Sequence, residues 1–309
     1  MTAVGHVTER HASLPDPAAP LTASGNLRRR VAVSRVITAL ASASALFAVA
    51  LLADVIYTVI HNGAPVLSLG FLTQNSNGLA GGGIANALLG TVAIVVFAAV
   101  IALPVGVLTG LYLTEFAGPR SRTASALKLV LDLLQGLPTI IVGVVVYGLI
   151  VAAEHQETGL AGSVALAIVM LPMIARSSQE VLLLVPGNLR EAADALGVER
   201  WRAVVSVILP AAAGGIATGA ILSIARAAGE TAPLLVVDSL YNPNQTQLML
   251  FGHGVPSIPM YIYTTYDLPA PSAIARAWGA ALVLLSCILM ANVGARLLLA
   301  RSQARVGAR

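Results

Sequence analysis

The chain of 309 residues is long enough for two soluble domains, but 57% of its residues are hydrophobic and only 10% are charged. This composition excludes an ordinary soluble protein and indicates an integral membrane protein. The net charge of +4 does not indicate nucleic-acid binding, because the arginines lie beside apolar runs and no basic cluster carries interleaved aromatic residues. The single cysteine, Cys287, excludes an intrachain disulfide and a cysteine metal cluster, and we interpret it as a packed side chain.

The N-terminal residues 1–35 are polar and rich in proline and small residues, so we predict a disordered cytoplasmic tail. Basic residues, Arg28 to Arg30 and Arg35, lead directly into the apolar run 36–60. At 1.5 Å per residue this run can cross a hydrocarbon core of ~30 Å. A cleaved signal peptide is the alternative, but the long tail and the length of the run favour an uncleaved anchor.

Further apolar runs predict five more spans. Together with the first, the predicted spans are 36–60, 84–113, 127–151, 160–175, 203–235 and 274–299. Pro104 is expected to kink the second span. Lys128 and Asp132 are one helical turn apart at the start of the third, and we expect them to pair.

The distribution of basic residues gives the topology. Residues 61–83 and 236–272 contain no Lys or Arg, and of the 18 basic residues only Arg226 and Arg276 lie away from the tail and the inner loops or flanks. The positive-inside rule therefore predicts six spans with both termini cytoplasmic. Residues 36–300 form the membrane domain and residues 301–309 a cytoplasmic C-terminal tail.

A short polar stretch, residues 186–210, interrupts the apolar sequence between the fourth and fifth spans. We predict a helix that begins after Asn188 as N-cap, with Glu191 placed for a capping box, and that ends at Gly197. A second helix follows, with Trp201 exposed as a contact residue. Such a helix, turn and helix between two membrane spans is suited to being held by another protein.

The predicted fifth span carries a charged pair, Arg226 and Glu230, four residues apart and therefore on one helical face. Ser223 continues this polar face. A charge at membrane depth costs about 2.5 to 3.5 kcal/mol even on the lenient insertion scale, so we expect the pair to have a role. It is either a salt bridge between helices or a gate in which Arg226 binds an oxyanion and Glu230 holds the arginine until the anion competes.

Two motifs resemble those of known transporters. The spacing of the Glu191-Ala192-Ala193 triplet from Gly197 and from Leu209-Pro210 resembles the cytoplasmic coupling loop, or EAA loop, of bacterial ABC importer permeases. The stretch from Arg226 to Leu234 resembles the fifth-span signature of the PstA family, the permease subunits of phosphate ABC importers. The resemblance covers residues 84–299, and its further matches are Gln135 to Gly143, Leu171 to Arg176 and Val185 to Ala193.

The resemblance implies an all-α integral membrane protein with the type I ABC importer permease fold, located in the bacterial cytoplasmic membrane. It also implies three kinds of partner: a homologous PstC-like permease, a PstB-like cytoplasmic ATPase dimer and an extracytoplasmic PstS-like phosphate-binding protein. We predict that the substrate path includes Arg226, Glu230, Ser223, Thr231 and Arg176, of which Arg226, Glu230 and Arg176 match family positions. The residues that the resemblance places in ATPase coupling are Glu191, Ala192, Ala193, Gly197, Trp201, Leu209 and Pro210.

No motif indicates catalysis by the chain itself. Its only lysine, Lys128, follows Leu127 rather than the glycine of a Walker A loop, so we expect ATP and Mg²⁺ only on the partner ATPase and no bound cofactor. The five histidines are scattered and predict no metal site. We therefore predict a phosphate importer permease that is not itself an enzyme.

The alternatives are a permease for another oxyanion or small solute and a phosphate sensor acting through residues 1–35. A secondary transporter is disfavoured, because the sequence shows no second copy of either motif.

Overall fold

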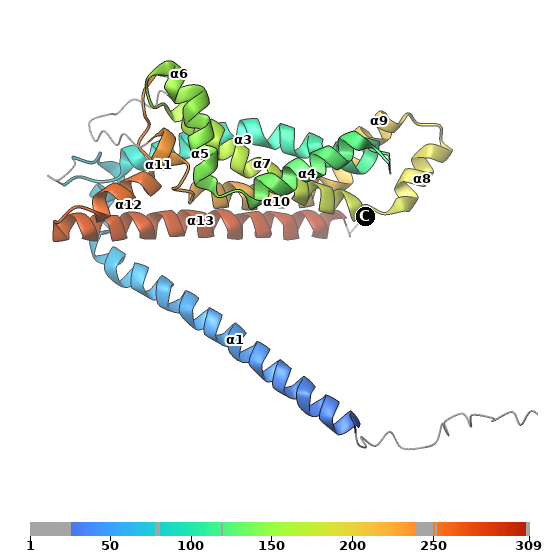
Figure 1. Ribbon diagram of the computed structural model, residues 1–309, viewed down its shortest axis with the longest axis horizontal. Coiled ribbons are helices and arrows are strands. Elements are labelled where there is room, and N and C mark those ends of the chain that lie inside the picture. The colour runs from blue at the N-terminus through green and yellow to red at the C-terminus, as the bar shows by residue number, and fades with distance from the viewer. Residues whose placement is uncertain (1–25, 78–80, 119, 239–249, 251, 307–309) are drawn as a thin grey trace, which may run out of the picture. The chain divides into compact units, whose positions relative to one another are not determined.

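The computed structural model describes residues 26–77, 81–118, 120–238, 250 and 252–306 (Figure 1). The chain divides into two units, Met1–Tyr57 and Thr58–Arg309. The described part of the first unit consists of most of helix α1 (Asn26–Gly63). This helix begins within the tail that we predicted to be disordered, while residues 1–25 lie outside the described part.

The second unit is helical throughout its described part, apart from turns and one isolated β-bridge between Ser76 and Gly82. Its helices before the polar stretch are η1 (Ala64–Val66), α2 (Leu69–Thr73), α3 (Ala85–Leu111), η3 (Tyr112–Phe116), α4 (Arg122–Gly136), α5 (Thr139–Val146), η4 (Tyr147–Val151), α6 (Ala152–Glu154) and α7 (Gly159–Leu183). Those that follow are α8 (Gly187–Ala195), α9 (Arg200–Ala203), η5 (Val204–Ile208), α10 (Leu209–Ala228), α11 (Leu234–Val237), α12 (Ile258–Tyr266) and α13 (Pro271–Val306).

Five helical segments of the described chain are long and apolar enough to cross a membrane, and a bent pair of helices offers a sixth crossing. The five are Leu27–Val66, Ala85–Phe116, Gly159–Leu183, Arg200–Ala228 and Pro271–Gly294. The bent pair is Arg122–Gly136 with Thr139–Glu154, at 104° to each other. The predicted all-helical membrane architecture is therefore confirmed, and the predicted third span, 127–151, is bent within its length.

The bend in the third span has a local cause. Leu137 precedes Pro138, and its backbone is extended (φ −73°, ψ 135°) instead of helical. The proline ring clashes with a helical conformation at the preceding residue, and proline has no N–H to continue the hydrogen-bond ladder. The chain therefore leaves α4 and restarts as α5 in a new direction.

Three helices end at other residues than the predicted membrane spans. Helix α7 continues to Leu183, beyond the predicted end of the fourth span at residue 175. Helix α10 ends at Ala228, so the last residues of the predicted fifth span form a turn before α11. Helix α13 continues to Val306 and includes most of the predicted C-terminal tail.

The core of the second unit lies between α3, α7, α10 and the segment around α11 and α12. Buried side chains from these elements, including Ile94, Leu166, Met170 and Ala227, form one cluster. Helices α3 and α7 approach closely because of small residues. A Cβ atom at Gly110 would lie 2.8 Å from the carbonyl oxygen of Ala175, so no larger residue fits there without a shift of the backbone.

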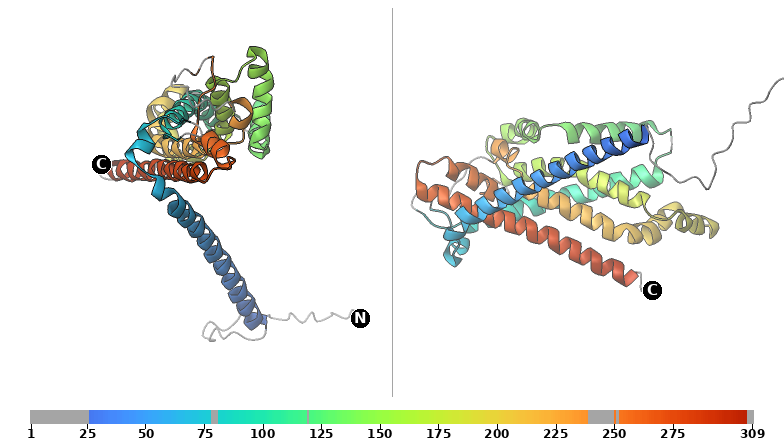
Figure 2. Two further views of the ribbon diagram at one scale, coloured as in Figure 1. Left: turned by 90° about the vertical axis from the view of Figure 1, so that its left-hand side faces the viewer. Right: turned by 90° about the horizontal axis from the view of Figure 1, so that it is seen from below.

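The polar stretch and the predicted outer segments lie at opposite ends of the second unit. Figure 1 shows α8 and α9 at one end, beside the C-terminal end of α13, whereas α6, α11 and α12 lie at the other. The view from below in Figure 2 gives the same arrangement. A second buried cluster, with Phe71, Ile84, Tyr261 and Ala280, closes the end that contains α12.

Candidate functional site

Helix α8 and its glycine turn form the first candidate site. The N-cap is Pro186 and it makes no side-chain capping bond, so the prediction that Asn188 caps the helix was wrong; Asn188 lies in the first turn. Gly197 has a left-handed backbone (φ +67°), as expected for a helix-ending glycine. The amide of Gly197 donates to the carbonyl of Asp194 at 3.0 Å, and that of Val198 to the carbonyl of Ala193 at 3.1 Å. These two bonds close the helix end and fix the turn toward α9.

The coupling residues predicted from the EAA spacing fall into two groups. Glu191, Ala192, Gly197, Trp201 and Pro210 are exposed and available to a partner. Ala193 is buried, and Leu209 packs against the apolar cluster at the base of α10. The second group therefore shapes the element instead of contacting another protein.

The surface around this element is apolar for a loop. Leu196 is 81% exposed and Leu184 is 80% exposed, and Trp201 is 55% exposed. The Trp201 indole N–H donates to the Glu199 carboxylate at 2.8 Å, and the Arg202 guanidinium lies 5.2 Å from the centre of the Trp201 ring. These contacts hold the tryptophan ring at the surface.

A buried carboxylate, which the sequence analysis missed, holds this element to the membrane helices. The side chain of Glu115, in η3, is only 1% exposed and lies against Arg190 of α8 and Arg200 of α9. A buried carboxylate is costly unless it is paired and hydrogen-bonded. The signal in the sequence was Glu115 itself, an acidic residue directly after the apolar run 84–113. Its partners, Arg190 and Arg200, had served only to assign the topology.

The second candidate site contains the charged pair. The Arg226 Nε lies 3.8 Å from the Glu230 Oε1, so the predicted pair forms, although Glu230 lies beyond the end of α10. The Arg226 side chain is 64% exposed and that of Glu230 only 18%. The Thr139 hydroxyl, at the start of α5, donates to Glu230 Oε2 at 3.5 Å. The pair therefore lies beside the bend between α4 and α5.

A cavity of about 360 Å³ opens at this bend and includes Arg226. Its wall is mostly apolar, with polar groups from Gln135, Thr139 and Arg226. The lining residues are Leu134, Gln135, Leu137, Thr139, Val142, Val169, Pro172, Met173 and Arg226. Few polar groups on an apolar wall are typical of a site for a small ligand.

Of the five residues predicted for the substrate path, only Arg226 lines this cavity; Glu230 pairs with it, and Ser223, Thr231 and Arg176 lie elsewhere. The Ser223 hydroxyl is buried and donates to the carbonyl of Gly219 in its own helix at 2.8 Å. Thr231 lies in the turn after α10, where its carbonyl accepts from the Leu235 amide at 3.0 Å. Arg176 pairs with Asp132 of α4 and donates to Gln179 at 3.2 Å. The predicted Lys128–Asp132 pair was wrong, because the structure pairs Asp132 with Arg176.

At the opposite end of the unit from α8, Asp238 is a buried carboxyl. Its Oδ1 accepts from the backbone amide of Val255 at 2.8 Å, whereas its Oδ2 has no partner in the described part of the chain. Burial raises the pKa of Asp238 well above its ordinary value, and the negative charge of Glu157 adds to the increase. The bond to Val255 fastens the segment before α12 to the end of α11.

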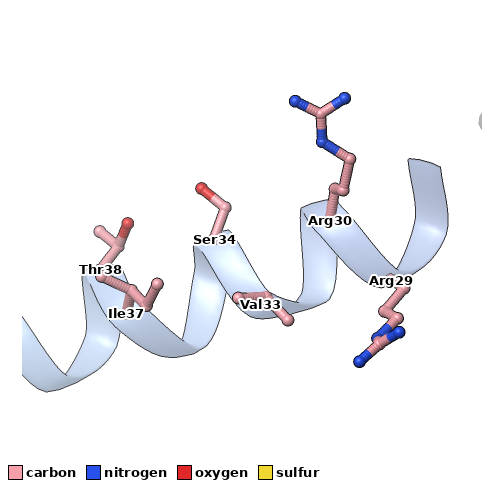
Figure 3. A pocket seen from close by; sticks show the side chains of 6 residues that line it. All are labelled: Arg29, Arg30, Val33, Ser34, Ile37 and Thr38. Atoms are coloured by element: carbon pink, nitrogen blue, oxygen red, sulfur yellow. The ribbon is translucent and has the colours of Figure 1, made fainter. Parts of the chain in front are cut away.

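Other features of the described residues carry no site. A hollow along α1 is lined by Arg29, Arg30, Val33, Ser34, Ile37 and Thr38 (Figure 3). All six belong to one helix, which has no opposing wall to enclose a ligand. No group of three or more His, Cys, Asp or Glu side chains in the described chain is placed to hold a metal ion.

A family model and individual relatives both identify the chain as similar to transport permeases. Residues 102–304 match the model of the family described as "Binding-protein-dependent transport system inner membrane component". The phosphate transport system permease protein PstA of Yersinia pestis is 35% identical over 272 residues, which cover 87% of this chain and 91% of that protein. The PstA of Haemophilus influenzae is 37% identical over 244 residues, covering 79% of this chain and 85% of the relative.

Solved structures of ABC importers share the fold. A bacterial alginate ABC transporter, in complex with an alginate-bound periplasmic protein, matches with a TM-score of 0.62 at 16% identity, covering 89% of this chain and 99% of that chain. The inward-facing MetNI methionine ABC transporter matches with a TM-score of 0.54 at 21% identity, covering 71% of this chain and 93% of that chain. The predicted type I permease fold is confirmed by these neighbours.

Proposed function

Because the chain belongs to the family of binding-protein-dependent transport system inner membrane components, and within it to the PstA phosphate permeases, we propose that it moves inorganic phosphate across the cytoplasmic membrane. It is a multi-pass protein of that membrane and one subunit of an ATP-driven importer. The partners would be a homologous PstC-like permease, a PstB-like ATPase dimer that holds ATP and Mg²⁺, and a PstS-like phosphate-binding protein. On this proposal the chain itself catalyses no reaction and binds no cofactor.

The observation that supports this function best is the charged pair beside the cavity. The planar guanidinium of Arg226 can donate two parallel hydrogen bonds to a phosphate. Glu230 lies 3.8 Å from that guanidinium, and a phosphate arriving in the cavity would compete for it. The Thr139 hydroxyl already faces Glu230 and would supply a further donor.

The proposed transport cycle uses the two ends of the unit. The element α8–α9 faces the cytoplasm and docks on the ATPase through Glu191, Ala192, Gly197 and Trp201. ATP binding moves that element, and α10 transmits the displacement because it is continuous with α9 through η5 and carries Arg226 near its other end. The cavity would then open alternately to the two sides of the membrane.

Uptake of labelled phosphate by proteoliposomes that contain the complete complex tests the role of the pair. We expect Arg226→Ala to abolish uptake while assembly of the complex is kept. Arg122→Ala is the matched control, since Arg122 is an exposed arginine at the start of α4, away from the cavity lining, and we expect uptake to be unchanged. Full uptake by a variant in which both Arg226 and Glu230 are alanine contradicts the gate.

The identity of the cargo is tested in the same vesicles. We expect unlabelled phosphate to suppress uptake of the label, and sulfate and molybdate at equal concentration to leave it unchanged. Suppression by sulfate or molybdate at equal strength would instead favour a permease for oxyanions in general.

A further inference from the structure

The buried carboxylate Glu115 is the meeting point of several segments that are distant in sequence. It lies in the π-helical turn η3, which continues α3. Its Oε1 accepts from the Arg190 Nε at 3.2 Å and from a terminal nitrogen of the same guanidinium at 2.7 Å. Arg200 adds a charged contact to Oε2 at 3.5 Å and donates from Nε to the Glu115 backbone carbonyl at 2.7 Å. The end of α3 is thereby joined to both α8 and α9.

The same Arg190 guanidinium also reaches the end of α7. Its two terminal nitrogens donate to the carbonyl of Val185 at 2.7 Å and to that of Leu182 at 2.9 Å. These carbonyls lie at and just beyond the last turn of α7, where the regular hydrogen bonds of the helix end. One arginine of α8 therefore binds the ends of two membrane helices at once.

The position of this network matters because α3 and α7 pack closely along their length and α7 reaches the cavity. Val169, Pro172 and Met173 of α7 lie in the cavity wall. Helix α9 continues through η5 and α10 to Arg226, and α8 follows α7 directly in the chain. The contact between Arg190 and Glu115 joins α8 to the end of α3. Both η3 and η5 are π-helical, a geometry often found at functional sites.

We propose that Glu115 is a positioning residue that fastens α8–α9 to the end of α3, so that a displacement of α8 moves α3 together with α7 and α10. The proposal rests on the proposed coupling role of α8–α9. Removal of the Glu115 charge leaves the guanidinium of Arg190 without its carboxylate, and α8 then moves independently of α3. ATP hydrolysis continues, but less of it produces transport.

The test uses the complete complex in proteoliposomes, with ATP hydrolysis and labelled phosphate uptake measured in one preparation. The variants are Glu115→Gln, which keeps the shape and removes the charge, Arg190→Gln, and the two combined. We expect Glu115→Gln to lower the phosphate taken up per ATP hydrolysed by about tenfold, within the roughly 5- to 150-fold range of allosteric couplings. The double variant should lose less than the two single losses combined, because Glu115 and Arg190 share one contact.

The distance between α3 and α8 is measured alongside the uptake and the hydrolysis. Spin labels at Leu108→Cys on α3 and Asp194→Cys on α8, in a Cys287→Ser background, report the distance between the two elements; Leu108 and Asp194 are both exposed. We expect the distance distribution to broaden in Glu115→Gln. Glu154→Gln, an exposed carboxylate at the opposite end of the unit, is the matched control and should change neither readout.

Two results would overturn the proposal: an unchanged ratio of uptake to hydrolysis, or an unchanged distance distribution with both activities lowered together. If Glu115→Gln does not assemble, the milder Arg200→Gln replaces it, with the same two results against the proposal. A wild-type complex that takes up no phosphate refutes the proposed function instead, and the spin-label distances still test the role of Glu115.

Discussion

Gly197 shows how one residue determines the direction of the polar element. Its backbone lies in the left-handed region, and no atom lies within 4 Å of the position that a Cβ atom would take. A side chain there meets no steric obstacle, so the only cost of substitution is the backbone conformation. For residues other than glycine this conformation costs roughly 1–2 kcal/mol, with asparagine and aspartate least affected.

We therefore expect Gly197→Val to change the turn between α8 and α9 and to lower the phosphate taken up per ATP hydrolysed. Gly197→Asn is the control, because asparagine tolerates the left-handed conformation, and it should retain most of the wild-type ratio. The measurement is uptake and hydrolysis in the same proteoliposomes. Equal loss in both variants would show that the glycine is needed for space at a partner surface, and not for its backbone.

The contact between α3 and α7 decides how the elements stay together. In a membrane, lipid is as apolar as the side chains, so helices associate through close packing more than through the hydrophobic effect. Gly110 allows this packing, since a Cβ atom there would lie 2.8 Å from the Ala175 carbonyl oxygen and 2.9 Å from the Ser178 Cβ. The obstacle is partly backbone, which cannot rotate away as a side chain can.

Gly110→Ala should therefore push α3 and α7 apart and destabilise the protein by about 1–3 kcal/mol, the usual cost of overpacking. Gly148→Ala is the control, because nothing lies within 4 Å of a Cβ atom at that position of η4. Thermal unfolding in detergent, followed by intrinsic fluorescence, compares the two variants with the wild type. A midpoint for Gly110→Ala equal to that of Gly148→Ala would mean that the helices adjust without cost.

At the scale of the whole molecule, the sequence predicted the features that depend on local patterns. Apolar runs of sufficient length located the spans, and the glycine and charge spacing located α8, its end at Gly197 and the Arg226–Glu230 pair. The break at Pro138 was within reach of the same local reasoning, but the sequence analysis considered a proline kink only at Pro104. The position of Arg176 against Asp132 and not on the cavity depends on how α4 and α7 pack, which no single-helix pattern gives.

The Glu115 network shows the limit of local patterns most clearly. Glu115 and Arg190 are 75 residues apart, and their contact results from the packing of α3 against α7 and from the path of the chain after α7. Hydropathy and the positive-inside rule assign Arg190 and Arg200 to one side of the membrane and go no further. A charged residue beside the membrane can therefore serve both topology and a specific buried pair.

The two ends of the second unit should face opposite sides of the membrane, since the positive-inside rule and the placement of α8 and α12 agree (Figure 1). In intact cells we expect a membrane-impermeant maleimide to label Asp267→Cys, after the end of α12, and not Asp194→Cys in α8. Both positions are exposed, and Cys287→Ser removes the native thiol. Permeabilised cells provide the control, because both cysteines should then react.

The labelling result tests how ATP hydrolysis is coupled to the permease as well as the topology. An ATPase in the cytoplasm can reach α8 only if that end faces inward, so labelling of Asp194→Cys in intact cells would remove the route by which ATP hydrolysis drives the permease. The cavity at Arg226 would then have to be opened by a force applied from the other end of the unit. There the described structure offers α11, α12 and the Asp238–Val255 contact, and no exposed helix–turn–helix comparable to α8 and α9.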